Sequence, residues 1–282
     1  DMDGLEYRVD VYVPEGEGPW PVVVAFHGGL VKKGHSTNAL VANAAARAGM
    51  VVFAPNWVDK WRQPLRIGPE EMALMTSAYR CALAYAQQEA GQYGGVPERT
   101  VVYGLSAGVH PAAHLALDPD NNLDPGCLSQ TAPLAPIGAV FGEGDYFLHM
   151  SFFDEGFETD AARMQANGAG LVDAALWPTD LSAKFRIWAA EIGTFRREFD
   201  DPWDENGWLA LRDPDGTIRH DLDELGLLDD GMIDYVDQGL LLLTRLQQAG
   251  IDVTFDTYPG QHTSEDKVPE LVAYLLDVAQ VP

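Results

Sequence analysis

The chain has 282 residues, which is enough for one large α/β domain with a substantial buried core. Its formal charge of −25 argues against nucleic acid and anionic membrane surfaces as partners. No apolar run approaches the roughly 20 residues that a membrane span requires. The first residues of the sequence do not have the pattern of a signal peptide. Composition therefore favours a soluble enzyme, cytoplasmic or secreted, and excludes the nucleic-acid-binding and membrane-spanning classes.

The first half of the chain alternates between short β-branched runs and helical patterns. Residues 7–13 alternate apolar and polar side chains, as an exposed antiparallel strand does, whereas 20–26 is a continuous apolar run typical of a strand buried on both faces. Further strands are predicted over 50–54 and 101–105, and helices over 36–47, 70–93 and 109–117.

The second half continues the alternation. Strands are predicted over 137–141, 185–192 and 251–257, and helices over 233–248 and from the loop after residue 262 to residue 279. Strands and helices in this order predict the α/β class, with a doubly wound, mostly parallel sheet and flanking helices in a single domain over 1–282.

Two segments are longer than the alternation requires. Residues 149–180 are polar with scattered aromatics and are interpreted as a cap or lid insertion, and 194–230 is an acidic stretch interpreted as a long loop insertion. Both follow strands, so we expect them over the carboxyl ends of the strands, where such sheets bind ligands.

The strand over 101–105 runs directly into Gly104-Leu105-Ser106-Ala107-Gly108, a Gly-x-Ser-x-Gly pentapeptide followed by a predicted helix. A serine between strand and helix is presented on a sharp turn, and the glycines are required because side chains there would collide with the returning backbone. The turn also places the Ala107 N–H at a helix N-terminus, where it can face a developing negative charge. The pattern predicts that Ser106 is a nucleophile.

The two cysteines, Cys81 and Cys127, are too few for a disulfide framework and form no C-x-x-C motif. They flank the Ser106 strand and helix, so a single bridge between them is open from sequence. A bridge would favour secretion, because disulfides persist in oxidising compartments.

With the serine turn in place, the chain resembles the α/β-hydrolase superfamily, and within it the carboxylesterases that carry an H-G-G loop and a G-x-S-A-G turn. The residues that carry the resemblance are His27-Gly28-Gly29, the pentapeptide around Ser106, and Tyr258-Pro259-Gly260-Gln261-His262 after the last strand. The resemblance implies Ser106 as nucleophile and His262 as the base that accepts its proton. It also implies an oxyanion hole of backbone N–H groups from Gly29, Leu30 and Ala107, although the family often has a third glycine where Leu30 stands.

Three other histidines occupy motif-like positions. The resemblance gives His27 a structural role in the oxyanion loop. His110 and His114 form H-x-x-x-H on the helix after Ser106, but the glutamate of a zinc-binding motif is absent, so we expect packing residues and no metal site.

The acid that orients the histidine is the least defined member of the set. The superfamily usually carries it just after the strand over 185–192, where this chain lacks the usual Gly-x-x-Asp. Asp201 is the candidate favoured here, with Asp200 next to it. Glu191 at the strand end, and Glu143 or Asp145 after the preceding strand, remain open alternatives.

These residues predict a serine hydrolase that cleaves a small-molecule carboxylic ester through an acyl-enzyme intermediate and needs neither a metal nor an organic cofactor. A peptidase, amidase or acyltransferase of the same fold would use the same residues. A catalytically inactive binding protein on this scaffold is a further alternative. The sequence does not indicate an oligomeric state.

Overall fold

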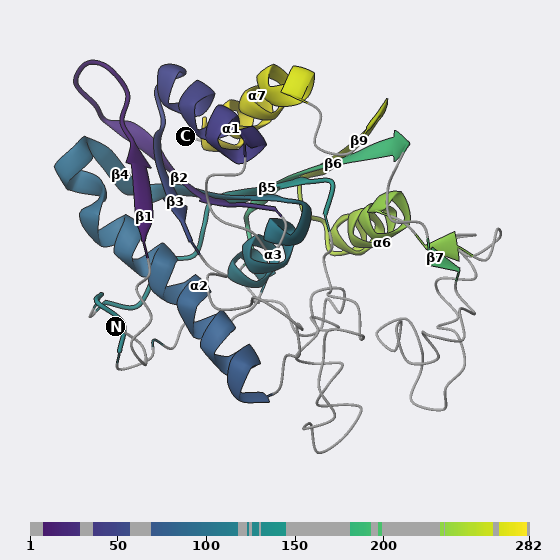
Figure 1. Cartoon of the computed structure of the whole chain (residues 1–282), viewed down its shortest axis with the longest axis horizontal. Helices are drawn as coiled ribbons and strands as arrows, with labels where there is room; N and C mark the ends of the chain where they lie inside the picture. Colours follow the sequence, from purple (N-terminus) through teal and green to yellow (C-terminus); the bar gives the residue numbers. More distant parts are fainter. Residues whose placement is uncertain are drawn as a thin grey trace.

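A central parallel sheet organises the molecule (Figure 1). The computed structural model describes residues 8–28, 36–56, 69–117, 123, 126–129, 131–144, 181–192, 197–198, 232–233, 235–261 and 265–280. The seven strands of the main sheet are β1 (Val9–Tyr12), β2 (Trp20–Phe26), β3 (Val51–Pro55), β4 (Gly95–Leu105), β5 (Gly138–Gly142), β6 (Lys184–Ile192) and β9 (Val253–Gln261).

The order of the strands is β1-β3-β2-β4-β5-β6-β9, so the chain starts near one edge, crosses to the centre and moves outward to β9. Only β1 runs antiparallel to its neighbour; the other adjacent pairs are parallel. The predicted doubly wound, mostly parallel sheet is confirmed. Because every parallel strand points the same way, the turns that follow β2, β4, β5, β6 and β9 meet at one edge of the sheet.

Helices cover both faces of this sheet. They are α1 (Ser36–Arg47), α2 (Pro69–Glu89), α3 (Val109–Leu117), α6 (Tyr235–Gln248) and α7 (Val268–Ala279). In Figure 1, α1 and α7 lie on one face and α2, α3 and α6 on the other. Each face has its own buried core, and alternate residues of a strand serve alternate cores: Val102 packs with the α2–α3–α6 side, and Tyr103 with the α1–α7 side.

Element boundaries differ from the sequence prediction mainly where strands extend beyond their apolar core. β4 begins at Gly95 because its first residue already pairs with Trp20 of β2, and β9 continues to Gln261 alongside β6. The predicted helix over 70–93 ends as α2 at Glu89 and tightens into the 3₁₀ turn η1 (Ala90–Tyr93), closed by Gly94 in the left-handed conformation at φ 72°.

A second, two-stranded ladder was not predicted. β7 (Arg197–Glu198) pairs antiparallel with β8 (Met232–Ile233), which directly precedes α6. The cap interpretation of 149–180 falls outside the described residues, as does all of the 194–230 loop except β7.

Cys81 of α2 and Cys127 form a disulfide, with Cα atoms 5.6 Å apart. The bridge left open by the sequence is therefore present, and it ties α2 to the segment that follows α3. Among the helices of the described part of the chain, none has the length and apolar character needed to cross a membrane.

Candidate active site

Ser106 stands at the sharp turn between β4 and α3. Its backbone has φ 53°, the left-handed region that costs a non-glycine residue about 1–2 kcal/mol, and the 3₁₀ turn η2 (Ser106–Gly108) leads directly into α3. The side chain is half-buried, so the residue is presented at the surface of the sheet's carboxyl edge. This is the strand–turn–helix geometry that the pentapeptide predicts.

The flanking glycines have no room for a side chain. A Cβ on Gly104 would collide with the backbone of Gly108, and one on Gly108 would collide with the carbonyl oxygen of Phe26 and lie 2.8 Å from that of His27. The tight turn is therefore packed between two backbone segments, and the serine conformation is imposed by its surroundings.

The beginning of the H-G-G loop contacts the same turn. A Cβ on Gly28 would lie 2.7 Å from the Leu105 carbonyl oxygen and 2.8 Å from the Ser106 Cβ. The structure thus brings the start of the predicted oxyanion loop, at Gly28, against the turn that carries the predicted nucleophile. Gly29 and Leu30, the proposed N–H donors of that loop, lie outside the described residues. Ala107, the third predicted donor, lies in the first helical turn, where backbone N–H groups have no acceptor within the helix.

A second strained turn follows the neighbouring strand. Gly142 of β5 pairs with Leu105 of β4, and the next residue, Glu143, has φ 52°. Gly144 then passes so close to the serine turn that a Cβ on it would collide with Val109 and lie 2.9 Å from the Ser106 carbonyl oxygen. One of the alternative acids therefore lies on the turn adjacent to the nucleophile.

The Glu143 side chain is fully buried, with 0% exposed surface. Its carboxylate accepts a hydrogen bond from the Tyr258 hydroxyl, and its backbone N–H donates to the Trp188 carbonyl oxygen at 2.7 Å. The Tyr103 hydroxyl is also buried nearby: burial, and secondarily the Glu143 carboxylate, raise the pKa of Tyr103 far above its ordinary value.

The remaining candidates are placed less completely. His262, Asp201, Asp200 and Asp145 lie outside the described residues, so their contacts with Ser106 stay predictions. Glu191 lies near the end of β6, and its side chain is not described.

The three described histidines, His27, His110 and His114, are packed against neighbouring groups. His27 is buried, with Nδ1 3.2 Å from the Gly28 carbonyl oxygen. The rings of His110 and His114 on α3 lie edge to face, with their centroids 4.5 Å apart. Both rings also lie against the ring of Tyr79 on α2. Among the described residues, no group of three or more histidine, cysteine or acidic side chains is placed to hold a metal ion.

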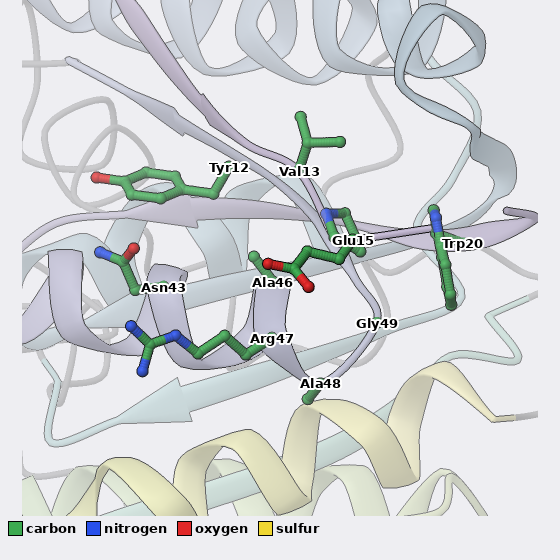
Figure 2. A pocket seen from close by; sticks show the side chains of 10 residues that line it. Tyr12, Val13, Glu15, Trp20, Asn43, Ala46, Arg47, Ala48 and Gly49 are labelled. Carbon is green, nitrogen blue, oxygen red and sulfur yellow. The ribbon is translucent and has the colours of Figure 1, made fainter. Parts of the chain in front are cut away.

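A pocket of about 610 Å³ lies at the other end of the sheet (Figure 2). It is lined by residues from β1, the turn after it, the start of β2 and the last turns of α1, with the Glu15 and Arg47 side chains prominent in Figure 2. Because Trp20 begins β2 and Gly49 follows α1, this hollow lies beside the amino ends of the strands and is separate from Ser106. The Trp20 ring lies close to Gly49: a Cβ added at Gly49 would be 3.1 Å from the nearest ring atom.

Sequence reasoning missed Tyr258 and Trp188, which enclose the buried Glu143. Trp188 lies in a strand predicted only as core, and Tyr258 follows the strand predicted over 251–257, in the pentapeptide before His262, where sequence reasoning assigned it no role of its own. The usable signal was Glu143 itself, because a glutamate directly after an apolar strand requires a buried partner.

Comparisons with known proteins agree with this geometry. The family model BD-FAE, which describes an esterase-like α/β-hydrolase domain, matches residues 9–141. No curated protein matches the chain in sequence.

The chain is similar in structure to esterase 2 of Thermogutta terrifontis in several states. The form phosphorylated by paraoxon has a TM-score of 0.63 and 16% identity, over 98% of this chain and 90% of that chain. The butyrate-bound form has a TM-score of 0.63 and 15% identity, over 98% of this chain and 90% of that chain. The form phosphonylated by sarin has a TM-score of 0.61 and 15% identity, over 98% of this chain and 91% of that chain. These matches confirm the predicted fold.

Proposed function

The chain has the α/β-hydrolase fold, and from that premise we propose that it is a serine hydrolase that cleaves carboxylic esters through an acyl-enzyme intermediate. The observation that carries the proposal is the Ser106 turn: a strained, half-buried serine between β4 and α3, with the start of the H-G-G loop packed against it. A strained nucleophile on a sharp strand-to-helix turn is typical of this catalytic arrangement.

In the proposed reaction, His262 accepts the Ser106 proton as the hydroxyl oxygen attacks the ester carbonyl. The N–H groups of Gly29, Leu30 and Ala107 stabilise the negative charge on the carbonyl oxygen. The tetrahedral intermediate collapses, His262 protonates the leaving alcohol, and the acyl group remains on Ser106.

Deacylation repeats the same steps with water. His262 removes a proton from the water that attacks the acyl-enzyme, and then returns a proton to Ser106 as the carboxylic acid leaves. Asp201 is the proposed acid that holds His262 in the required tautomer and stabilises its protonated form.

The acyl-enzyme route is supported by the comparison structures only through analogy. The similar Thermogutta esterase is phosphorylated by paraoxon, which suggests a direct experiment on this chain. A fluorophosphonate probe should label the wild type at Ser106 and leave Ser106→Ala unlabelled.

The kinetic test is hydrolysis of p-nitrophenyl esters of increasing acyl length by wild type, Ser106→Ala, Asp201→Asn and Asp200→Asn. We expect Ser106→Ala to lose at least about 10⁴-fold in kcat and one aspartate variant to lose a comparable amount. Wild type that is inert on every ester and unlabelled by the probe would refute the proposal. Faster cleavage of the matching anilides would instead indicate an amidase.

A further inference from the structure

The buried cluster of Glu143, Tyr258 and Trp188 lies at the sheet edge that carries Ser106, but none of its side chains has a role in the reaction proposed above. Exposed fractions are 0% for Glu143, 3% for Tyr258 and 1% for Trp188. A buried carboxylate is costly unless it is hydrogen-bonded, so the contacts that hold Glu143 at this edge are specific ones.

Tyr258 is the centre of the cluster. Its hydroxyl donates to the Glu143 carboxylate, and its ring stacks on the Trp188 indole with centroids 4.3 Å apart and planes 8° from parallel. Glu143 is in turn fixed by its N–H bond to the Trp188 carbonyl oxygen at 2.7 Å. Three strands, β5, β6 and β9, are thereby joined at their carboxyl ends by one closed set of contacts.

The same tyrosine also contacts the chain beyond β9. β9 ends at Gln261, and the next described turn, η8 (Glu265–Lys267), begins at Glu265. Lys267 Nζ lies 4.7 Å from the centroid of the Tyr258 ring. Tyr258 therefore lies in the strand before residues 262–264 and contacts Lys267 in the turn after them.

We propose that Tyr258, held by Glu143 and Trp188, is a positioning residue that links β9 to the η8 turn on either side of residues 262–264 and so aligns His262 with Ser106. The inference rests on the serine hydrolase function proposed above. Glu143 acts in it as the acceptor that locks the tyrosine hydroxyl, and the acid that contacts the histidine remains Asp201.

Alignment of a catalytic base affects turnover more than binding. A displacement of about 1 Å can lower the rate by up to about 100-fold while the substrate site is unchanged. We therefore expect Tyr258→Phe, which keeps the ring on Trp188, to lower kcat about tenfold on p-nitrophenyl acetate with KM unchanged within about twofold.

The chain offers a matched control on the same strand. The Tyr274 hydroxyl of α7 donates to the Asp256 carboxylate of β9 at 2.7 Å, so Tyr274→Phe removes the same kind of bond from an exposed position. This variant should keep kcat within about twofold of wild type, because its bond lies outside the buried cluster.

Variants at Glu143 test whether Tyr258 requires a hydrogen-bond acceptor at this position or a negative charge. Glu143→Gln keeps an oxygen that can accept from Tyr258 and should retain most of the activity, whereas Glu143→Ala should lose as much as Tyr258→Phe. The double variant Tyr258→Phe/Glu143→Ala should be no worse than either single variant, since both remove one hydrogen bond. Thermal unfolding of each variant shows whether the fold is intact.

The outcomes are distinct. Equal kcat for Tyr258→Phe and Tyr274→Phe in an active, probe-labelled enzyme overturns the positioning role and leaves the serine hydrolase function standing. A Glu143→Gln loss as large as that of Ser106→Ala also overturns it, because Glu143 would then be the acid itself. A wild type that neither hydrolyses esters nor reacts with the fluorophosphonate refutes the underlying function.

Discussion

Two adjacent turns at the carboxyl edge of the sheet have the same backbone strain and opposite side-chain environments. Ser106 after β4 and Glu143 after β5 are the non-glycine residues with positive φ in the described part of the chain, at 53° and 52°. The serine is half-buried and presented outward, while the glutamate is wholly enclosed. The same backbone conformation therefore presents a side chain at the surface in one turn and buries a side chain in the other.

The difference lies in what holds each turn. The serine turn is held by backbone packing, through glycines that approach neighbouring carbonyl groups. The Cys81–Cys127 bridge in addition joins α2 to the segment after α3, the helix that follows this turn. The glutamate turn is held by side-chain contacts, a buried hydrogen bond and an aromatic stack. The following predictions test this contrast, from the largest expected effect to the smallest.

Removing the disulfide should have the largest effect on stability. The two cysteines are 46 residues apart in the sequence. Closing a loop of that length reduces the entropy of the unfolded chain and so raises its free energy by about 4 kcal/mol at 25 °C. Cys81→Ser/Cys127→Ser should unfold at a markedly lower denaturant concentration than wild type. Reductant should lower the midpoint of wild type and leave that of the double variant unchanged; an equal response in both would contradict the prediction.

Gly108→Ala should cost about 3 kcal/mol, because its Cβ meets the fixed Phe26 and His27 carbonyl groups and neither can move without breaking the sheet edge. Gly91→Ala is the control, since a Cβ there meets no atom within 4 Å. Chemical denaturation of both variants measures the difference. A Gly108→Ala protein as stable as Gly91→Ala would show that backbone packing does not hold the serine turn.

Glycine substitutions should have opposite signs at the two turns. Ser106→Gly relieves about 1–2 kcal/mol of strain against about 0.5–1 kcal/mol of added freedom in the unfolded chain, so it should be slightly more stable than wild type. Glu143→Gly gains the same relief but leaves the Tyr258 hydroxyl buried without its acceptor, at a cost of about 1–3 kcal/mol. Calorimetric Tm values should therefore move up for the first variant and down for the second, and a shift in the same direction would refute the contrast.

Tyr103→Phe should have the smallest effect. The Tyr103 hydroxyl is buried and has no hydrogen-bond partner among the residues that the structure describes. Burial also raises its pKa, so removing the oxygen should raise stability by up to about 1 kcal/mol. Urea unfolding of the variant measures this gain. A loss of stability would indicate that the hydroxyl supports the Glu143 carboxylate.

Much of the fold was predictable because it depends on local patterns. The continuous apolar run of β2 and the helical pattern of α3 gave the observed bounds, Trp20–Phe26 and Val109–Leu117. The serine turn was predictable for the same reason, since its glycines are required by contacts within a few residues and with the neighbouring strand.

What the sequence could not predict depends on residues far apart in the chain. The Cys81–Cys127 bridge was open because only the packing of α2 against the segment after α3 brings the two sulfur atoms together. Likewise, nothing local links Glu143 to Tyr258, which lies 115 residues further along. The acid stays a set of candidates because burial and neighbours, which set a carboxylate's role, are tertiary properties.

The β7–β8 ladder has a consequence for how such a protein can change. It pairs Glu198 with Met232, so the two chain positions that border the 33 residues between them lie side by side. The cost of closing a loop grows only with the logarithm of its length, about 0.6 kcal/mol per doubling. This ladder is therefore a natural graft point, where segments of other lengths can be exchanged while β6 and α6 keep their places on the scaffold.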